Sequence, residues 1–410
     1  MSAKQYDVIV VGARCGGSPT AMHLARKGHR VLLLDRAAFP SDTISTHALH
    51  PPGVAALRRW GLLERLTETG CPPIDTYMFD FGSGVITGAP GIERAPVAYA
   101  PRRTVLDKIL VDAAAEAGSE VRERFAVTGV VVDHGRVTGI TGHGANGLTV
   151  TERARVVIGA DGVRSTVARA VRPERYHEKP RLETAYYSYW SGLPMNHRVE
   201  TYVRPRRAIV AIPTHDDLTL VAVSWPFAEV RANRTDVEGR FSASLDLVPS
   251  FAERIGRASR ESRFVGASLP NFFRRPFGPG WALVGDAGYV KDAVTAQGIS
   301  DAFRDAELCA TAVDEALSGS RPYEEAMGSY QAARDGHALP MYEFTGQLAQ
   351  LGPLPEDFEQ LLVAMRGDQR AMDGFARMYG GAIPPTEFFS DENVHRIVAG
   401  VTDMAAVAVP

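Results

Sequence analysis

The chain has 410 residues and a formal net charge of -3, with 45% hydrophobic and 23% charged residues. This composition predicts two or three well-buried globular domains, and it gives no sign of a nucleic-acid surface, a polybasic membrane patch or a membrane span. The three cysteines, Cys15, Cys71 and Cys309, lie far apart and predict neither a disulfide framework nor a metal site.

The N-terminal segment predicts a strand, a glycine-rich turn, a helix and a second strand. Residues 6–11 (YDVIVV) form a mostly β-branched run that is typical of a buried parallel strand. Residues 19–27 have the apolar spacing of a helix that ends at Gly28, and residues 30–34 predict the second strand. The unit has about thirty residues, the size of a βαβ crossover. The N-terminus, residues 1–6, is polar as a whole and leads directly into the first strand, so we expect no secretory leader and a cytoplasmic location.

Further along the chain, predicted helices and strands alternate. Helices are expected at residues 51–60 and 104–117, and strands at 76–81 and 96–100. Short strands at 127–132, 137–141 and 148–150 are typical of a small antiparallel meander, and residues 156–158 predict another buried strand.

The middle of the chain is richer in aromatic residues. Alternating strands at 183–190, 200–203, 208–213 and 218–225 indicate a separate sheet, followed by helices at 237–247 and 251–259. Residues 281–284 predict a short buried strand, and the pattern is helical from Gly298 onward.

The turn after the first strand, GARCGG, has the features of a dinucleotide-binding loop. Gly12 permits a tight turn and Gly17 allows the helix to pack closely, while the helix N-terminus presents N–H groups to a pyrophosphate. Asp35, at the end of the second strand, is suited to a ribose hydroxyl. Arg14 replaces the usual middle glycine, so either its guanidinium or the backbone at Gly16 would approach the phosphates. The alternative interpretation is that the glycine turn binds no ligand and that Asp35 is a solvated turn residue.

Two further motifs follow predicted buried strands. Residues 159–165 read GADGVRS, and residues 283–288 read LVGDAG, with AQGI at 296–299 opening a long helix. With the glycine turn, in this order and at these separations, residues 5–315 resemble the para-hydroxybenzoate hydroxylase-like, or group A, flavoprotein monooxygenases. The resemblance implies bound FAD with NAD(P)H as the reductant.

The resemblance also implies roles for individual residues. Asp286 would bind the ribityl chain, and the backbone N–H groups of Gly298 and Ile299 would face the flavin pyrimidine edge, where a helix dipole stabilises negative charge. Asp161 is linked in the family to FAD and nicotinamide handling, and Arg103 to an FAD contact at a helix start. The complete implied cofactor set is Gly12, Arg14, Cys15, Gly16, Gly17, Asp35, Arg36, Thr46, Arg103, Asp161, Gly285, Asp286, Gly298 and Ile299, without any metal ligand.

The chain departs from the family pattern after the GD motif. Tyr289 stands in place of a histidine, Ala293 of a proline, Ala296 of a glycine and Ser300 of an asparagine. These changes concern the loop beside the flavin more than the nucleotide-binding turns.

The resemblance implies an α/β fold with a discontinuous Rossmann-like FAD-binding domain. We assign this domain to residues 1–75, 96–180 and 262–320. A β-sheet substrate domain is expected at 76–95 and 181–261, and a helical C-terminal region at 321–410, which would cap the substrate pocket or form a homodimer contact.

The implied reaction is hydroxylation of a small aromatic or polyketide-like substrate. In the resembled family, NAD(P)H reduces FAD, and O2 then gives a flavin C4a-hydroperoxide that hydroxylates an electron-rich ring. Thr46 and His47 would lie beside the flavin, with His47 acting as a proton shuttle or only stabilising its loop. The predicted substrate-side residues are Tyr187, Tyr189, Trp190, Tyr202, Arg204, His215 and Trp225.

Three other functions share this pattern. One is a flavin-dependent reductase of isoprenoid C=C bonds, like the geranylgeranyl reductases. Another is a halogenase, although the WxWxIP signature is absent, since residues 189–194 read YWSGLP. The last is an FAD-binding protein without turnover. Besides the small-molecule substrate and O2, a separate flavin reductase that supplies reduced flavin remains an open possibility as a partner.

Overall fold

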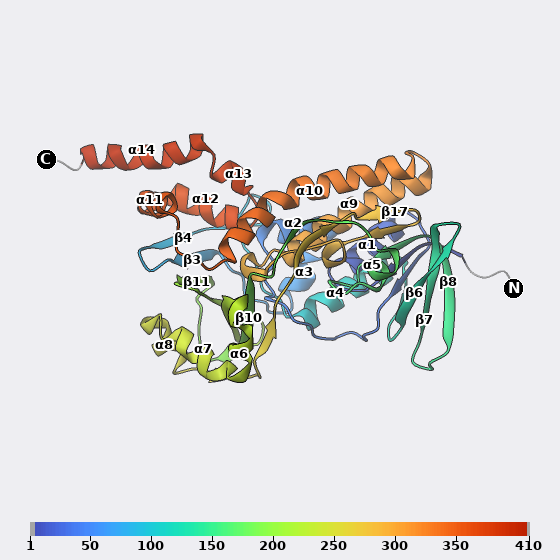
Figure 1. Ribbon diagram of the computed structural model, residues 1–410, viewed down its shortest axis with the longest axis horizontal. Helices are drawn as coiled ribbons and strands as arrows, with labels where there is room; N and C mark the ends of the chain where they lie inside the picture. Colours follow the sequence, from blue (N-terminus) through green and yellow to red (C-terminus); the bar gives the residue numbers. More distant parts are fainter. Residues whose placement is uncertain (1–4, 408–410) are drawn as a thin grey trace.

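The computed structural model describes residues 5–407; residues 1–4, which belong to the polar segment that predicts no leader, lie outside them. The described strands form two eight-stranded sheets and one three-stranded sheet. In Figure 1, α9 and α10 run along the top of the first sheet, α6–α8 lie below β10 at the lower left, and α11–α14 lie at the upper left. The expected α/β class, with a helical C-terminal region, is confirmed.

The first sheet contains the predicted N-terminal strands. Its order is β17-β18-β8-β1-β2-β5, and β18, β8, β1, β2 and β5 run parallel. Both faces are covered at the centre of the sheet, which explains why β2 and the second half of β1 are continuous apolar runs. Their bounds are β1 Gln5–Val11, β2 Val31–Leu34, β5 Glu120–Arg122, β8 Thr149–Gly159, β17 Phe277–Gly278 and β18 Trp281–Leu283.

Alternate residues of β1 point into two different cores. Val8 and Val10 pack against the helices of one face, whereas Ile9 and Val11 pack against a β-ribbon and a short helix on the other. The first face is covered by α1 Gly17–Arg26, α2 Pro51–Trp60, α3 Leu63–Thr67, α4 Arg103–Glu116, α9 Gly298–Ser318 and α10 Tyr323–Leu348; the second is covered by β6 Ala126–Asp133, β7 Arg136–His143 and α5 Thr166–Val171.

Two sequence expectations differ from the observed strands. The strands expected at 148–150 and 156–158 are one strand, β8, which pairs antiparallel with β7 and parallel with β1. Residues 96–100 do not form a strand and make only isolated bridges, Leu49 with Tyr99 and Ile74 with Ala98. The physical reason is that Pro96 and Pro101 flank the segment and have no N–H to extend the ladder.

The second sheet forms a separate layer, with the order β14-β10-β13-β12-β11-β3-β4 and β15 beside β10. One of its faces packs against α7 and α8. The bounds are β3 Thr76–Asp80, β4 Val85–Gly88, β10 Glu183–Ser191, β11 Arg198–Arg204, β12 Arg207–Pro213, β13 Thr219–Pro226, β14 Ser259–Arg260, β15 Val265–Ala267, α6 Val230–Thr235, α7 Val237–Leu245 and α8 Pro249–Ile255. The small third sheet joins β9 Arg175–Lys179, β16 Asn271–Arg274 and β19 Tyr289–Val290.

The C-terminal helices pack against the other face of the second sheet. Phe375 and Met378 of α12 share a core with Tyr77 and Phe79 of β3 and with Ile212 of β12. No helix among residues 5–407 is long and apolar enough to cross a membrane. The bounds are α11 Glu356–Met365, α12 Gln369–Tyr379, α13 Pro385–Phe388 and α14 Asp391–Val407.

Candidate cofactor and substrate site

The three motif turns lie side by side at one edge of the first sheet. Val11 pairs with Leu34 on one side and with Gly159 on the other, and Gly159 pairs in turn with Leu283. The carboxyl ends of adjacent parallel strands meet at one edge, which is where open α/β sheets bind ligands. The glycine turn, Asp35, the DG motif and the GD motif are therefore neighbours despite their separation in sequence.

The glycine turn has no room for larger residues. Gly12 has φ +100°, and a Cβ there would lie 2.5 Å from the carbonyl oxygen of Ala160. A Cβ at Gly17 would lie 1.7 Å from the carbonyl oxygen of Gly12. Helix α1 therefore starts directly against the strand. Its Ser18 N–H donates to the carbonyl oxygen of Arg14 at 3.0 Å, and Pro19 has no N–H, so the N–H groups that a pyrophosphate would meet are those of the turn before Ser18.

Asp35 holds this turn in position. One carboxylate oxygen accepts a hydrogen bond from the N–H of Ala13 at 2.7 Å, and the other accepts from the N–H of Ala37 at 2.8 Å. The side chain is 9% exposed. Each oxygen can accept a second hydrogen bond, so a ribose hydroxyl could still bind. Arg36 is exposed beside it.

A buried ion cluster lies under the turn. Asp107, which is 0% exposed, pairs with Arg14 at 2.5 Å and with Arg103 at 2.9 Å. Two cations on one carboxylate leave a net positive charge, which favours a nearby pyrophosphate. Arg14 also donates to the hydroxyl of Ser41 at 2.7 Å and so fixes the next loop. Burial raises the pKa of the Cys15 thiol, so Cys15 is a packed residue with Gly16 buried beside it.

The DG and GD motifs each present a carboxyl group at this edge. Asp161 caps α5 by accepting from the N–H of Thr166 at 2.6 Å, while its Oδ1 is buried without a partner among the described residues. Asp286 follows Gly285, which has φ +58°. The Asp286 side chain is reached by solvent but is closely surrounded by protein. The surrounding protein raises the pKa of Asp286, whereas the charges of Lys291 and Arg103 lower it.

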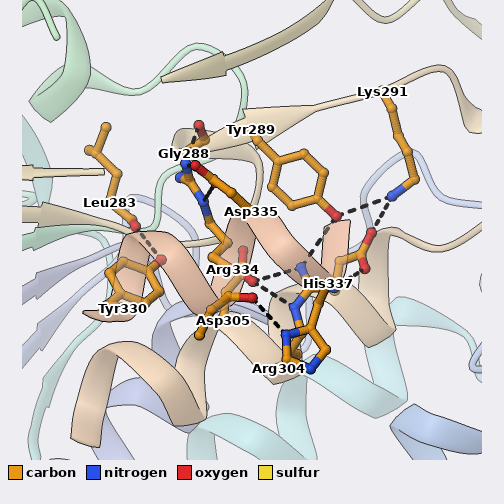
Figure 2. Close-up of polar contacts among 12 residues, drawn as sticks. Leu283, Gly288, Tyr289, Lys291, Arg304, Asp305, Tyr330, Arg334, Asp335 and His337 are labelled. Carbon is orange, nitrogen blue, oxygen red and sulfur yellow. Dashed lines mark hydrogen bonds and ion pairs between the residues drawn. The ribbon is translucent and has the colours of Figure 1, made fainter. Parts of the chain in front are cut away.

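A polar network anchors the loop that follows the GD motif (Figure 2). The hydroxyl of Tyr289 accepts from Lys291 at 3.1 Å and from Arg304 at 3.4 Å. Lys291 pairs with Asp301, and Arg304 pairs with Asp301 and with Asp305, both at 2.8 Å. Burial opposes ionisation of Asp301, yet Lys291 and Arg304 hold its pKa at about 2. Tyrosine at this position thus ties the loop to α9.

Helix α9 begins where the flavin edge is expected. The side chain of Ile299 is buried in the core, which leaves only its backbone for a ligand. Gly298 is exposed, and a Cβ there would have no neighbour within 4 Å. The first N–H groups of a helix have no helical acceptor and carry partial positive charge. Together with the turn, the cations and the carboxylates, this donor set fits FAD.

A cavity lies between the second sheet and the loop that precedes α9. Its wall combines aliphatic and aromatic side chains with a few polar ones and one acid. The polar and titratable lining residues are Thr46, His50, Tyr77, Tyr99, Glu183, Thr201, Ser224 and Tyr379, and the loop contributes Ala293, Val294 and Ala296.

His47 lies beside this cavity, next to Tyr187 and Tyr189 on the same face of the sheet. It is 0% exposed, has φ +64°, and its Nε2 lies 2.5 Å from the hydroxyl of Tyr189. Its Nδ1 is buried without a partner among the described residues. Burial, then the charges of Arg102 and Arg103, lower the pKa of His47 to about 3, so the ring is neutral. The N–H of Ser45 donates to the Tyr187 hydroxyl at 3.4 Å.

The other predicted substrate residues lie away from the cavity. Trp225 and Tyr202 belong to the core on the opposite face, under α7 and α8, and Trp190 packs against it. Arg204 pairs with Asp80 at 3.0 Å. Strand alternation directs these four residues to the face opposite to the cavity, so the structure does not bring them together with Tyr187 and Tyr189.

His215 is also engaged outside the cavity. Its Nε2 contacts the hydroxyl of Thr69 at 2.8 Å, and its Nδ1 accepts from the N–H of Arg102 at 3.1 Å. The titratable cavity residues that were not expected are His50, Tyr77, Tyr99, Glu183 and Tyr379. The only sequence signal for Glu183 is an acid at the start of an aromatic strand, on the same face as Ala185.

Known proteins resemble this chain over most of its length. One family profile, described as FAD binding domain, matches residues 5–345. The digeranylgeranylglycerophospholipid reductase 2 of Methanothermobacter thermautotrophicus is 29% identical over 327 residues, covering 77% of this chain and 80% of its own. The kynurenine 3-monooxygenase of Salinispora arenicola is 26% identical over 370 residues, covering 82% of this chain and 78% of its own.

The fold is also similar to that of solved structures. The myxobacterial chondrochloren halogenase CndH, described as a variant of FAD-dependent halogenases, superposes with a TM-score of 0.80 at 23% identity, covering 97% of both chains. At this identity the likeness concerns the fold alone.

Proposed function

Since the chain belongs to the FAD binding domain family and is an FAD-dependent oxidoreductase, we propose that it is a monooxygenase that hydroxylates a small aromatic or polyketide-like molecule with NAD(P)H and O2. The observation that carries the proposal is the mainly apolar cavity bounded by the loop between the GD motif and α9. The cavity has a volume of about 70 Å³, so its lining side chains would have to move apart to admit a ring-bearing substrate. A ring bound there would lie close to the expected flavin edge with little contact with water.

Bound FAD would supply the redox chemistry, taking a hydride from NAD(P)H and passing electrons to O2. We propose that the N–H groups of the glycine turn and the charges of Arg14 and Arg103 bind its pyrophosphate. Asp35 would bind the adenosine ribose, and Asp286 the ribityl chain. Residues 1–75, 96–180 and 262–320 form the FAD-binding part in this proposal.

The N-terminus of α9 would stabilise the reduced flavin. The backbone N–H groups of Gly298 and Ile299 present partial positive charge where negative charge develops. The network of Tyr289, Lys291 and Asp301 holds the preceding loop rigid, and this rigidity keeps the helix end in register with the ring.

His47 and Tyr189 are proposed to relay a proton near the flavin. The imidazole is neutral, so it can accept a proton at one nitrogen while releasing one at the other without holding a net charge. The hydrogen bond to Tyr189 defines one end of this path, and the unpartnered Nδ1 defines the other.

Incorporation of oxygen from ¹⁸O2 tests the proposed reaction. The purified protein, with FAD and NAD(P)H, is incubated with phenols and polyketide-type aromatics, and products are examined by mass spectrometry. One ¹⁸O atom in a hydroxylated product supports the proposal. Hydroxylation that appears only with an added flavin reductase would assign reduction to a separate protein.

Reduction of an isoprenoid C=C bond is the second candidate function. It is favoured by the reductase relatives, of which one is 29% identical. A reductase would saturate an isoprenoid without O2, whereas the proposed monooxygenase forms no product anaerobically. A protein that binds FAD without turnover would fail both tests.

A further inference from the structure

Glu183 places a carboxyl group in the cavity wall at the start of β10. The residue is 3% exposed. The Ser224 hydroxyl and the N–H groups of Ala293 and Val294 lie near its carboxyl group and act to lower its pKa, but its Oε2 makes no hydrogen bond of normal geometry among the described residues. It lines the cavity with Ala185, Ala222 and Ser224 of the same sheet face. A buried acceptor without a partner costs folding free energy, so its presence at a ligand cavity points to a ligand group.

A second carboxyl group lies behind Glu183. Asp292 accepts from the amide of Asn271 at 2.6 Å, and its own N–H donates to the Asn271 carbonyl oxygen at 2.8 Å. Its Oδ1 also lacks a partner within the described chain. The Asn271 clamp thus holds a second acid against Glu183, and the two carboxyls repel each other when both are ionised.

The rest of the cavity offers no opposite charge. Within residues 5–407, no lysine or arginine lines it. His50 is held by Tyr77 at 2.6 Å and by the carbonyl oxygen of Thr295 at 3.1 Å, and burial lowers its pKa to about 4, so it is neutral. The titratable or charged groups around Glu183 are Asp292, His50, Tyr77, Tyr99 and Tyr379, with Lys291 beyond His50 and Arg181 near Asp292.

We propose that Glu183 is the specificity-determining residue of the cavity: it accepts a hydrogen bond from a hydroxyl group on a neutral ring-bearing molecule, and the Glu183–Asp292 pair repels carboxylates. The inference rests on the proposed function, because it names the substrate class of that same cavity. The aliphatic wall, with Ile74, Val210 and Ile212, suits an uncharged ring.

The test compares 2-naphthol with 2-naphthoate, which share a ring system and differ in charge. Equilibrium dialysis against the FAD-loaded protein at pH 8 is expected to give at least about tenfold tighter binding of 2-naphthol, because the carboxylate of 2-naphthoate would face a like charge. Glu183→Gln keeps the shape and removes the charge, so it should recover most of the 2-naphthoate affinity.

Two controls make the result specific. Glu253→Gln removes the same charge from the exposed part of α8, on the far side of the sheet, and should leave the preference unchanged. If Glu183→Gln does not fold, the wild-type protein still decides: burial, with Asp292, raises the pKa of Glu183 to about 7, so 2-naphthoate should bind better at pH 6 than at pH 8.

Equal affinity for both probes in the wild-type protein, or a preference unchanged in Glu183→Gln, overturns the inference even if ¹⁸O2 labels a product. If the wild-type protein prefers 2-naphthol to 2-naphthoate and Glu183→Gln loses this preference, but no product contains ¹⁸O, only the proposed function is overturned. The two failures are therefore distinguishable.

Discussion

The carboxylate of Asp35 accepts a 2.7 Å hydrogen bond from the N–H of Ala13, inside the turn that begins at Gly12. The bond joins the end of β2 to the loop after β1, so the residue suited to the ribose also shapes the proposed phosphate site. Loss of this carboxylate should therefore affect two parts of the dinucleotide at once.

Asp35→Ala should weaken FAD binding by about 10- to 100-fold, because a hydrogen bond to a charged group contributes about 1.5–3 kcal/mol. FAD release by ultrafiltration measures the change. Asp7→Ala is the matched control, since Asp7 accepts from the N–H of Arg30 at 2.9 Å near the opposite end of the same strands. Equal FAD loss in both variants would mean that general destabilisation, and not the turn, is responsible.

His47→Ala and Tyr189→Phe should each lower kcat by about 10- to 100-fold while FAD content is unchanged, as expected for a lost proton-transfer path. Product formation per enzyme-bound FAD is the measurement. Because the pKa of His47 is lowered to about 3, its charge should add no step to the pH profile of kcat near neutrality. Tyr186→Phe, on the opposite face of β10, should be silent, and unchanged turnover in His47→Ala would remove the relay.

Lys291→Met should destabilise the protein by about 3 kcal/mol, because it leaves the largely buried Asp301 with fewer partners. Tyr289→Phe should cost only about 1 kcal/mol, since Lys291 and Arg304 keep their carboxylate partners. Urea unfolding measures both. Lys27→Met breaks the exposed pair with Asp314 and should cost less than about 1 kcal/mol. A larger loss of stability in Lys27→Met than in Lys291→Met would contradict the assigned role of the network.

The sequence was sufficient to predict that the three motif turns follow buried strands of one sheet, and the reason is physical. Apolar runs such as residues 6–11 are long enough to be recognised as buried strands, and parallel strands bring their carboxyl ends together. The observed pairing of Val11 with Gly159 and of Gly159 with Leu283 follows that rule. The turns after these strands could therefore be assigned to one site.

The substrate side could not be predicted in the same way. Alternation separates Tyr187 and Tyr189 from Trp190 on β10, but it does not say which face α7 and α8 will cover. Tyr379 enters the cavity from a C-terminal helix, and Asp292 approaches Glu183 from the loop before α9. These contacts depend on tertiary packing between segments that no local pattern connects.

The free energy of unfolding of Glu183→Gln, relative to that of the wild-type protein, should increase as the pH rises. A carboxyl whose pKa is raised on folding stabilises the protein below its unfolded pKa, and this contribution is lost as pH rises through the folded value of about 7. Between about pH 5 and pH 8, the variant should gain up to roughly 3 kcal/mol relative to wild type. Thermal unfolding across this range measures the difference, and a pH-independent difference would contradict burial of this acid.

Flavin absorbance during anaerobic addition of NADH or NADPH, followed by admission of O2, tests the central claim most directly. We expect a yellow protein whose colour bleaches with the nucleotide, alone or after a substrate is added, and returns with O2. A colourless protein that cannot be reconstituted with FAD, or a flavin that neither nucleotide reduces with or without substrate, would contradict it.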